Sequence, residues 1–299
     1  MTSTLAPVTP TTADGPEQPR RTRGWLLGGV PLLVVYVIVF LVPEVVFLSK
    51  AFFTTTGPGE VGGPATFATI GETVSADFTI RALVTTLELG AITAVVCVVL
   101  GLPLAYASVH WRRWGSPIFI AVVAVMLSSA VARVLGWQVV LGYTGVINKL
   151  LLELNLIGQP LPLSDNFFAV CVGQIHAALP LAVIGLIPAC TSIRTSVLDA
   201  SSGLGASQLT TFGRIILPQC RGAVVSIALI VFATTAGSFT TPALLGGGRV
   251  PVLSLLIYNE ILQKFDYAGA AATALLLLLI VGLVVLAALL ADRKPRVVR

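Results

Sequence analysis

Long apolar runs are the feature that most constrains this chain of 299 residues. Six runs reach the roughly 20 residues that a helix needs to cross a hydrocarbon layer of about 30 Å. Charged residues make up only 10% of the chain, which leaves too little polar surface for a water-soluble protein. Lipid offers the backbone no hydrogen-bond partner, and the run 275–280 lacks the alternation of a barrel strand. The sequence therefore predicts an all-α, polytopic membrane protein with about six transmembrane helices, at approximately 25–48, 82–107, 117–141, 167–190, 223–245 and 268–291.

Basic residues are shared unequally between the two sets of loops that these spans define. Twelve of the 18 Lys and Arg residues lie in one set, at 20–23, 112–113, 194–221 and 293–299. Five lie in the opposite set, and Arg133 falls inside a predicted span. Because basic loops are retained on the cytoplasmic side, we expect both termini in the cytoplasm. This asymmetry also explains the net charge of +5 without a nucleic-acid partner.

The ends of the chain differ in composition from the region between them. Residues 1–23 are rich in Thr, Pro and charge and should form a disordered cytoplasmic tail. The apolar run that follows is too long for a signal-peptide core and is expected to stay as an anchor. We expect a transmembrane domain over 24–291 and a basic cytoplasmic tail over 292–299. The four cysteines lie in or beside spans without C-x-x-C spacing, so neither a metal site nor a disulfide is expected.

A polar segment on the basic side, between the fourth and fifth spans, has helix-forming character. Residues 192–207 predict a short helix near the membrane surface, glycines at 203 and 205 allow a sharp turn, and residues 209–216 return before Pro218 ends the second helix. We call this helix-turn-helix, residues 192–216, the knob. The alternatives are an ordinary amphipathic interfacial helix and an element that enters a cleft on a soluble partner.

Sequence signatures of catalysis are absent. The chain has no phosphate-binding loop G-x-x-x-x-G-K-[ST], no nucleophile elbow and no H-E-x-x-H helix. We therefore predict no enzymatic activity, no catalytic residue and no cofactor. If transport requires an energy input, that input comes from another subunit.

The knob resembles the signature loop of ABC-importer permeases. The resemblance rests on the small acidic opening, the glycine six residues later, and the apolar pair before proline; the residues are Asp199, Ala200, Ser201, Gly205, Ala206, Ile215, Leu217 and Pro218. In that family this coupling loop, here 191–222, is the segment to which the ATPase binds. The usual Glu-Ala-Ala opening is Asp-Ala-Ser in this chain, a conservative change for docking.

The resemblance extends over roughly 25–291. The segments 133–137, 141–148, 179–180, 231–248 and 266–268 are similar to segments of spermidine/putrescine-type permeases. It implies the MetI-like permease fold with a cytoplasmic coupling helix, in the cell membrane of a prokaryote. It also implies two ATPase subunits, a second permease that is either identical or a homologue, and an extracytoplasmic solute-binding protein. The first helix would wrap a neighbour, and the outer loops 142–148 and 246–251 would contact the binding protein.

The resemblance favours polyamines as the solute. The acidic residue often found before the Phe at 239 is Ser238 here, however, and a polyamine path benefits from carboxylates. Ferric iron, phosphonate, thiamine or another small solute therefore stays as an alternative. A secondary transporter without an ATPase is a remote alternative; it would predict an internal repeat and a helix broken at the midplane, and the sequence indicates neither. A membrane enzyme or a non-transporting scaffold is less favoured.

Ionisable groups inside the spans are candidates for the translocation path, because a charge in lipid costs at least ~2.5 kcal/mol. Glu88 and Arg133 both fall in the outer half, where they either pair or contact the solute; alternatively Arg133 bonds helix-end carbonyls. Trp137 lies one turn after Arg133 and either lines an outer vestibule or belongs to an interfacial belt. His176 is expected to be a hydrogen-bonded core residue. The path candidates are Glu88, Arg133, Trp137, Phe239 and Thr240.

Overall fold

A computed structural model describes residues 30–31 and 33–292. The chain divides into a first unit that ends at Val46 and a second that starts at Phe47. The predicted N-terminal tail, and the C-terminal tail beyond Asp292, lie outside the described residues. The second unit carries every element from η2 onward, including those that position the site.

The described part is mainly helical, as the sequence predicts. Six of its helical segments are long and apolar enough to cross a membrane: Leu33–Phe52, Asp77–His110, Ala130–Glu153, Phe167–Thr191, Gln208–Ala236 and Tyr267–Ala291. The elements in chain order are η1 (Val37–Leu41), α2 (Val42–Ser49), η2 (Lys50–Phe52), β1 (Thr54–Gly57), β2 (Glu60–Gly62), α3 (Ala68–Ser75), α4 (Asp77–His110), α5 (Arg112–Leu127), α6 (Ala130–Leu141), α7 (Val146–Glu153), α8 (Phe167–Thr191), α9 (Thr195–Gly203), α10 (Gln208–Thr211), η3 (Phe212–Ile216), α11 (Leu217–Ala236), α12 (Thr240–Leu245), α13 (Leu253–Leu262) and α14 (Tyr267–Asp292). The predicted all-α polytopic fold is confirmed. Within the described residues it also contains a small two-stranded hairpin, which the sequence analysis does not predict.

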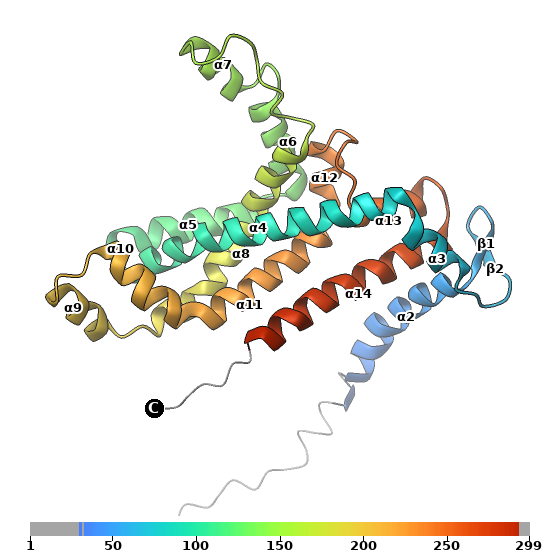
Figure 1. Cartoon of the computed structure of the whole chain (residues 1–299), viewed down its shortest axis with the longest axis horizontal. Coiled ribbons are helices and arrows are strands. Elements are labelled where there is room, and N and C mark those ends of the chain that lie inside the picture. The colour runs from blue at the N-terminus through green and yellow to red at the C-terminus, as the bar shows by residue number, and fades with distance from the viewer. Residues whose placement is uncertain (1–29, 32, 293–299) are drawn as a thin grey trace, which may run out of the picture. The chain divides into compact units, whose positions relative to one another are not determined.

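The core lies where α4, α8 and α11 pack together (Figure 1). Glycines bring these helices close: a Cβ on Gly90 of α4 would lie 2.8 Å from the Phe232 ring of α11, and one on Gly185 of α8 would lie 2.1 Å from Ile227. Small residues at helix contacts are the usual device of membrane bundles, where packing rather than water exclusion holds helices together. The three helices therefore form the rigid centre of the domain.

The two ends of this bundle are distinct (Figure 1). At one end, which we call the knob end, lie α9 and α10; at the other, which we call the hairpin end, lie α3 and the antiparallel pair β1 and β2. Asp266 joins the hairpin to α14, because its Oδ1 accepts hydrogen bonds from Thr55 Oγ1 and, at 2.9 Å, from the Gly269 amide in the first turn of α14. The helix α4 starts at the hairpin end and finishes at the knob end.

The third predicted span, 117–141, is wrong as a single helix. It forms two helices, α5 and α6, with Ser128 and Ser129 between them in extended conformation (ψ of 143° and 137°). The Ser128 hydroxyl donates to the Val125 carbonyl at 2.8 Å, so it satisfies one of the carbonyls that the end of α5 leaves open.

The fifth predicted span, 223–245, is also wrong as a single helix. The structure ends α11 at Ala236 and starts α12 at Thr240, with Gly237, Ser238 and Phe239 between them. The Ser254 hydroxyl donates to the Ser238 carbonyl at 2.8 Å and so satisfies a carbonyl at this break. Ser254 belongs to α13, a ten-residue helix that is too short to cross a membrane and that hydropathy does not predict.

Candidate functional site

The knob begins with α9 and turns at Gly205. The Ala206 amide donates to the Ser201 carbonyl and the Gly205 amide to the Ser202 carbonyl, both at 3.0 Å, while Gly205 has φ of +77°. This is the Schellman pattern of helix ends, which places a glycine in the left-handed region because a Cβ is unfavourable there. Gly205 is thus the residue that turns the chain.

The second half of the knob is not a separate helix, and the expectation that Pro218 ends it is wrong. The helices α10, η3 and α11 form one continuous segment, Gln208–Ala236. Pro218 lies in the first turn of α11, directly after the π-helical turn η3, where the Leu217 amide donates to Phe212. A π turn widens the helix directly before Pro218 and so gives room for the proline ring, which would clash with the preceding turn of a regular α-helix. The knob therefore continues directly into α11.

A side-chain bond joins the two arms of the knob. Ser201 Oγ of α9 lies 2.9 Å from Thr211 Oγ1 of α10, and Ser201 is only 7% exposed. Among the predicted coupling residues, Asp199 and Ala200 are exposed, whereas Ser201 faces inward. The structure thus places Ser201 as a link within the knob.

Two leucines beside the turn were not among the predicted coupling residues. Leu204 is 88% exposed and Leu209 is 86% exposed, the highest values among the large hydrophobic side chains of the described residues. The signal for them was present in the sequence, since leucines in a polar segment flank the Gly205 turn on either side. They give the tip of the knob an apolar contact surface.

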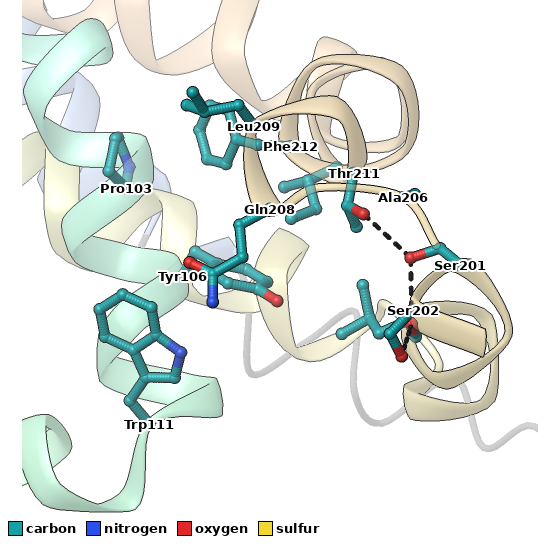
Figure 2. A pocket seen from close by; sticks show the side chains of 12 residues that line it. Pro103, Tyr106, Trp111, Ser201, Ser202, Ala206, Gln208, Leu209, Thr211 and Phe212 are labelled. Carbon is teal, nitrogen blue, oxygen red and sulfur yellow. Dashed lines mark hydrogen bonds between the residues drawn. The ribbon is translucent and has the colours of Figure 1, made fainter. Parts of the chain in front are cut away.

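A cavity of about 440 Å³ separates the knob from the end of α4 (Figure 2). Pro103, Tyr106 and Trp111 line it from the α4 side, and Gln208 and Phe212 line it from the knob. Figure 2 shows the Ser201–Thr211 bond on the far side of this space from Trp111. The knob is therefore joined to α11 by continuous helix, while its contact with α4 is incomplete.

Arg133 closes the first helix break. Its Nη1 donates to the Val125 carbonyl at 2.6 Å and to the Ser128 carbonyl at 3.3 Å. Of the alternatives for Arg133, bonding to helix-end carbonyls is the one observed. Within the described part of the chain no ion pair joins Arg133 to Glu88. The alternative in which Arg133 pairs with Glu88 is therefore not observed.

Trp137 and His176 are joined by a hydrogen bond between α6 and α8. Trp137 Nε1 donates to His176 Nδ1 at 2.8 Å, and the two rings meet edge to face with centroids 5.8 Å apart. An indole N–H only donates, so His176 Nδ1 must be unprotonated here. His176 is hydrogen-bonded in the packed part of the bundle, as expected, and Trp137 is fixed to it.

Phe239 and Thr240 lie at the second break. Phe239 is 41% exposed, and its ring stacks on Tyr258 of α13 with centroids 5.0 Å apart. Thr240 is the first residue of α12 and is half-buried. These two candidates belong to the segment that follows the end of α11.

Glu88 faces a cavity of about 390 Å³ at the hairpin end. Thr85 of α4, Asn166 and Arg249 line the same space. Arg249 belongs to the loop 246–251, which is predicted to lie on the outer side of the membrane. The five path candidates therefore do not form one cluster, and Glu88 lines a cavity with other polar side chains.

Comparison with known proteins identifies relatives over most of the chain. No model of a known protein family matches it. The spermidine/putrescine transport system permease protein PotB of Haemophilus influenzae is 25% identical over 87% of this chain and 90% of its own length. PotB of Escherichia coli is 28% identical over 68% of this chain and 74% of its own. A putative 2-aminoethylphosphonate transport system permease protein, PhnU of Salmonella typhimurium, is 27% identical over 84% of this chain and 86% of its own.

Solved structures give the same fold. A bacterial alginate ABC transporter in complex with an alginate-pentasaccharide-bound periplasmic protein contains a chain with a TM-score of 0.74 and 20% identity, covering 91% of this chain and 95% of that one. A chain of the inward-facing MetNI methionine ABC transporter gives a TM-score of 0.56 over 71% and 93% of the two chains. The predicted resemblance and fold are confirmed.

Proposed function

Since this chain is a multi-pass membrane permease of the ABC-importer type, we propose that it forms half of the solute pathway of an ATP-driven, binding-protein-dependent importer for polyamines. It works with an ATPase and a solute-binding protein. The solute assignment rests on the two PotB relatives and on the acidic side chain that lines the cavity at the hairpin end. Hydrolysis of ATP belongs to the partner subunit.

The continuity of the knob with α11 carries the mechanistic part of the proposal. The segment Gln208–Ala236 has 29 residues, so at 1.5 Å per residue it extends about 43 Å, enough to cross the membrane. Its knob end carries the exposed Leu209, and its other end leads directly to Phe239. A displacement of the knob is thus transmitted along a rigid helix to the opposite side of the bundle.

Assembly follows the family pattern. Two ATPase subunits bind the knobs of two permeases, this chain and either a homologue or a second copy, and the first helix packs on that neighbour. The knob end faces the cytoplasm, with both termini on that side and the transmembrane domain over 24–291. Asp199, Ala200, Leu204 and Leu209 contact the ATPase, because they are exposed on the knob. The loops 142–148 and 246–251 contact the binding protein.

Transport proceeds by alternating access. Closure of the ATP-bound ATPase pair brings the knobs together and rotates the attached helices, which opens the hairpin end to the docked binding protein. Hydrolysis and release of the ATPase pair reverse the movement and open the knob end. The solute passes between the two permeases and meets the groups at the hairpin end first.

An aminoalkylphosphonate is a second candidate solute. Besides the PhnU relative, two arginines favour it: Arg81 and Arg249 line a cavity of about 620 Å³ at the hairpin end. Cations at an entrance attract an anionic phosphonate and repel a polycation. Glu88 nearby suits the amino group that both kinds of solute carry.

The test is solute-stimulated ATP hydrolysis by the complex reconstituted with its ATPase and candidate binding proteins. Spermidine, putrescine, 2-aminoethylphosphonate and ferric ion are compared, with Gly205→Arg as the uncoupled control. Stimulation by polyamine alone, lost in the control at equal membrane expression, supports the proposal. Stimulation by another solute alone removes the polyamine assignment. A control as active as the parent removes the assignment of the knob.

A further inference from the structure

The cavity at the hairpin end holds charges of both signs. Glu88 and Arg249 line one space of about 390 Å³, together with the polar side chains of Thr85 and Asn166. No hydrogen bond or ion pair joins Glu88 to Arg249 within the described residues. Both charged groups are therefore available to a ligand.

Glu88 lies within a membrane-spanning helix, where a charged carboxylate costs free energy unless it has polar partners. It is exposed at the surface of α4, in the midst of a membrane-spanning helix. One, two and three turns further along the same face lie Ile92, Val95 and Val99, all exposed and all apolar. A carboxylate cannot face hydrocarbon cheaply, so Glu88 needs polar surroundings, and the cavity that it shares with Thr85, Asn166 and Arg249 supplies them. A cation entering from the hairpin end meets its last anionic partner on this helix face there.

Arg249 lies between two spaces. It lines the cavity of Glu88 and also the neighbouring cavity of about 620 Å³, whose other charged residue is Arg81. Thr85 and Pro251 are likewise common to both, so the two spaces adjoin. Arg81 lies two turns before Glu88 on α4 and outside the smaller cavity. A solute that is bound by Glu88 therefore reaches Arg249 within the same cavity, whereas Arg81 lines only the neighbouring one.

We propose that the smaller cavity is a solute-binding site of the permease itself, which takes a primary ammonium group. Glu88 binds the ammonium, Thr85 and Asn166 supply neutral hydrogen-bond partners, and Arg249 selects the group at the other end of the solute. This inference rests on the proposed import function. Polyamines and aminoalkylphosphonates share the ammonium and differ at the far end, where one carries a second cation and the other an anion.

Arg249 makes opposite contributions for these two solutes. A guanidinium repels the second ammonium of putrescine but binds a phosphonate with charge-assisted hydrogen bonds. Loss of the Arg249 charge should therefore strengthen putrescine binding and weaken 2-aminoethylphosphonate binding. The sign of the change identifies the solute class, whereas loss of Glu88 weakens both.

The test measures equilibrium binding of radiolabelled putrescine and 2-aminoethylphosphonate to the full permease assembly in lipid nanodiscs, without binding protein. We compare Glu88→Gln, Arg249→Gln and the control Lys264→Gln, which removes a positive charge from an exposed position between α13 and α14, outside the lining of both cavities. Glu88→Gln should weaken binding of the wild-type ligand at least about 10-fold, since a hydrogen bond to a charged group is lost. Lys264→Gln should change it less than about 2-fold.

Two results overturn the proposal: neither compound binds the wild-type assembly, or Glu88→Gln binds as the wild type does. If Arg249→Gln changes binding no more than Lys264→Gln does, Arg249 has no selecting role. The import function is measured separately, as solute-stimulated ATP hydrolysis. Binding that depends on Glu88 in a complex without such stimulation keeps the site and refutes the importer.

Discussion

Replacement of the two leucines at the tip of the knob is the most direct test of ATPase docking. Leu204 and Leu209 are 88% and 86% exposed, so their truncation removes almost no packing within the permease. Burial of a leucine side chain in a partner is worth about 1.5 to 3 kcal/mol. A loss of about 2 kcal/mol per Leu→Ala change corresponds to roughly 30-fold weaker binding. The double variant should bind roughly 10³-fold more weakly if the two effects add.

The assay is titration of the purified ATPase subunit onto the permease in nanodiscs, followed by the rate of ATP hydrolysis at saturation. Leu127→Ala is the matched control, because Leu127 is 82% exposed but lies at the end of α5, outside the knob. The free energy of unfolding should change by less than about 0.5 kcal/mol in all these variants, as is usual for exposed positions. Weak docking in a well-folded permease is therefore the expected pattern.

Three outcomes of this titration are informative. Docking lost in the knob variants and kept in Leu127→Ala supports the contact. Equal affinities for the double variant, the control and the parent would refute the reasoning from exposure. A large drop in the melting temperature of the double variant would show that the leucines are packed within the assembly, against what their exposure indicates.

Gly205→Ala should cost about 1 kcal/mol of helix-end stability and reduce coupled ATP hydrolysis, because alanine is strained at φ of +77° although no atom lies within 4 Å of the new Cβ; Gly205→Asn, which tolerates this conformation, should retain more activity. Arg133→Met should destabilise the domain by about 1.5 to 3 kcal/mol in thermal unfolding, since the Ser128 carbonyl loses its charged donor and the Val125 carbonyl keeps only its bonds from Ser128, while Arg133→Lys should cost less. A fully stable Arg133→Met would contradict the capping role. Gly90→Ala should destabilise by about 1 to 3 kcal/mol, because its Cβ would lie 2.8 Å from the Phe232 ring; Gly136→Ala, with no atom within 4 Å, serves as the neutral control for the melting temperature.

Hydropathy predicted the membrane class, six candidate spans and the position of the knob. The membrane class and the spans depend on hydropathy summed over some 20 residues, and the turn of the knob depends on local turn chemistry. Both can be derived from one continuous segment of sequence. Gly205 illustrates the second kind, because a glycine after a short helix is the ordinary residue of a Schellman turn. Pro218 illustrates the limit: a proline predicts a helix end, but the preceding π turn that accommodates it depends on how α10 joins α11.

The contacts of the site were beyond sequence reasoning because they join distant segments. The Trp137–His176 bond spans 39 positions, and the cavity of Glu88 is completed by Arg249, far along the chain. Glu260 went unnoticed altogether, although it is a buried carboxylate that accepts a hydrogen bond from Thr273 at 2.9 Å. Its helix, α13, is shorter than a membrane span, so a search for long apolar runs does not find it.

The two helix breaks connect these observations. Four of the five predicted path candidates lie at or after a break: Arg133 and Trp137 lie on α6 after the first break, Phe239 lies in the second, and Thr240 is the first residue of α12. Irregular backbone at membrane depth is tolerated only where protein covers it or where it lines an aqueous cavity, because its amides and carbonyls need partners. Side chains satisfy part of this need, Arg133 at one break and Ser254 at the other. Removal of Arg133 should therefore do more than destabilise the fold: it should leave the Ser128 carbonyl free to bind cations, so that Arg133→Met leaks small cations in proteoliposomes where Arg133→Lys does not. No leak from either variant would mean that the first break is covered by protein and that the aqueous path runs along Glu88 and the second break alone.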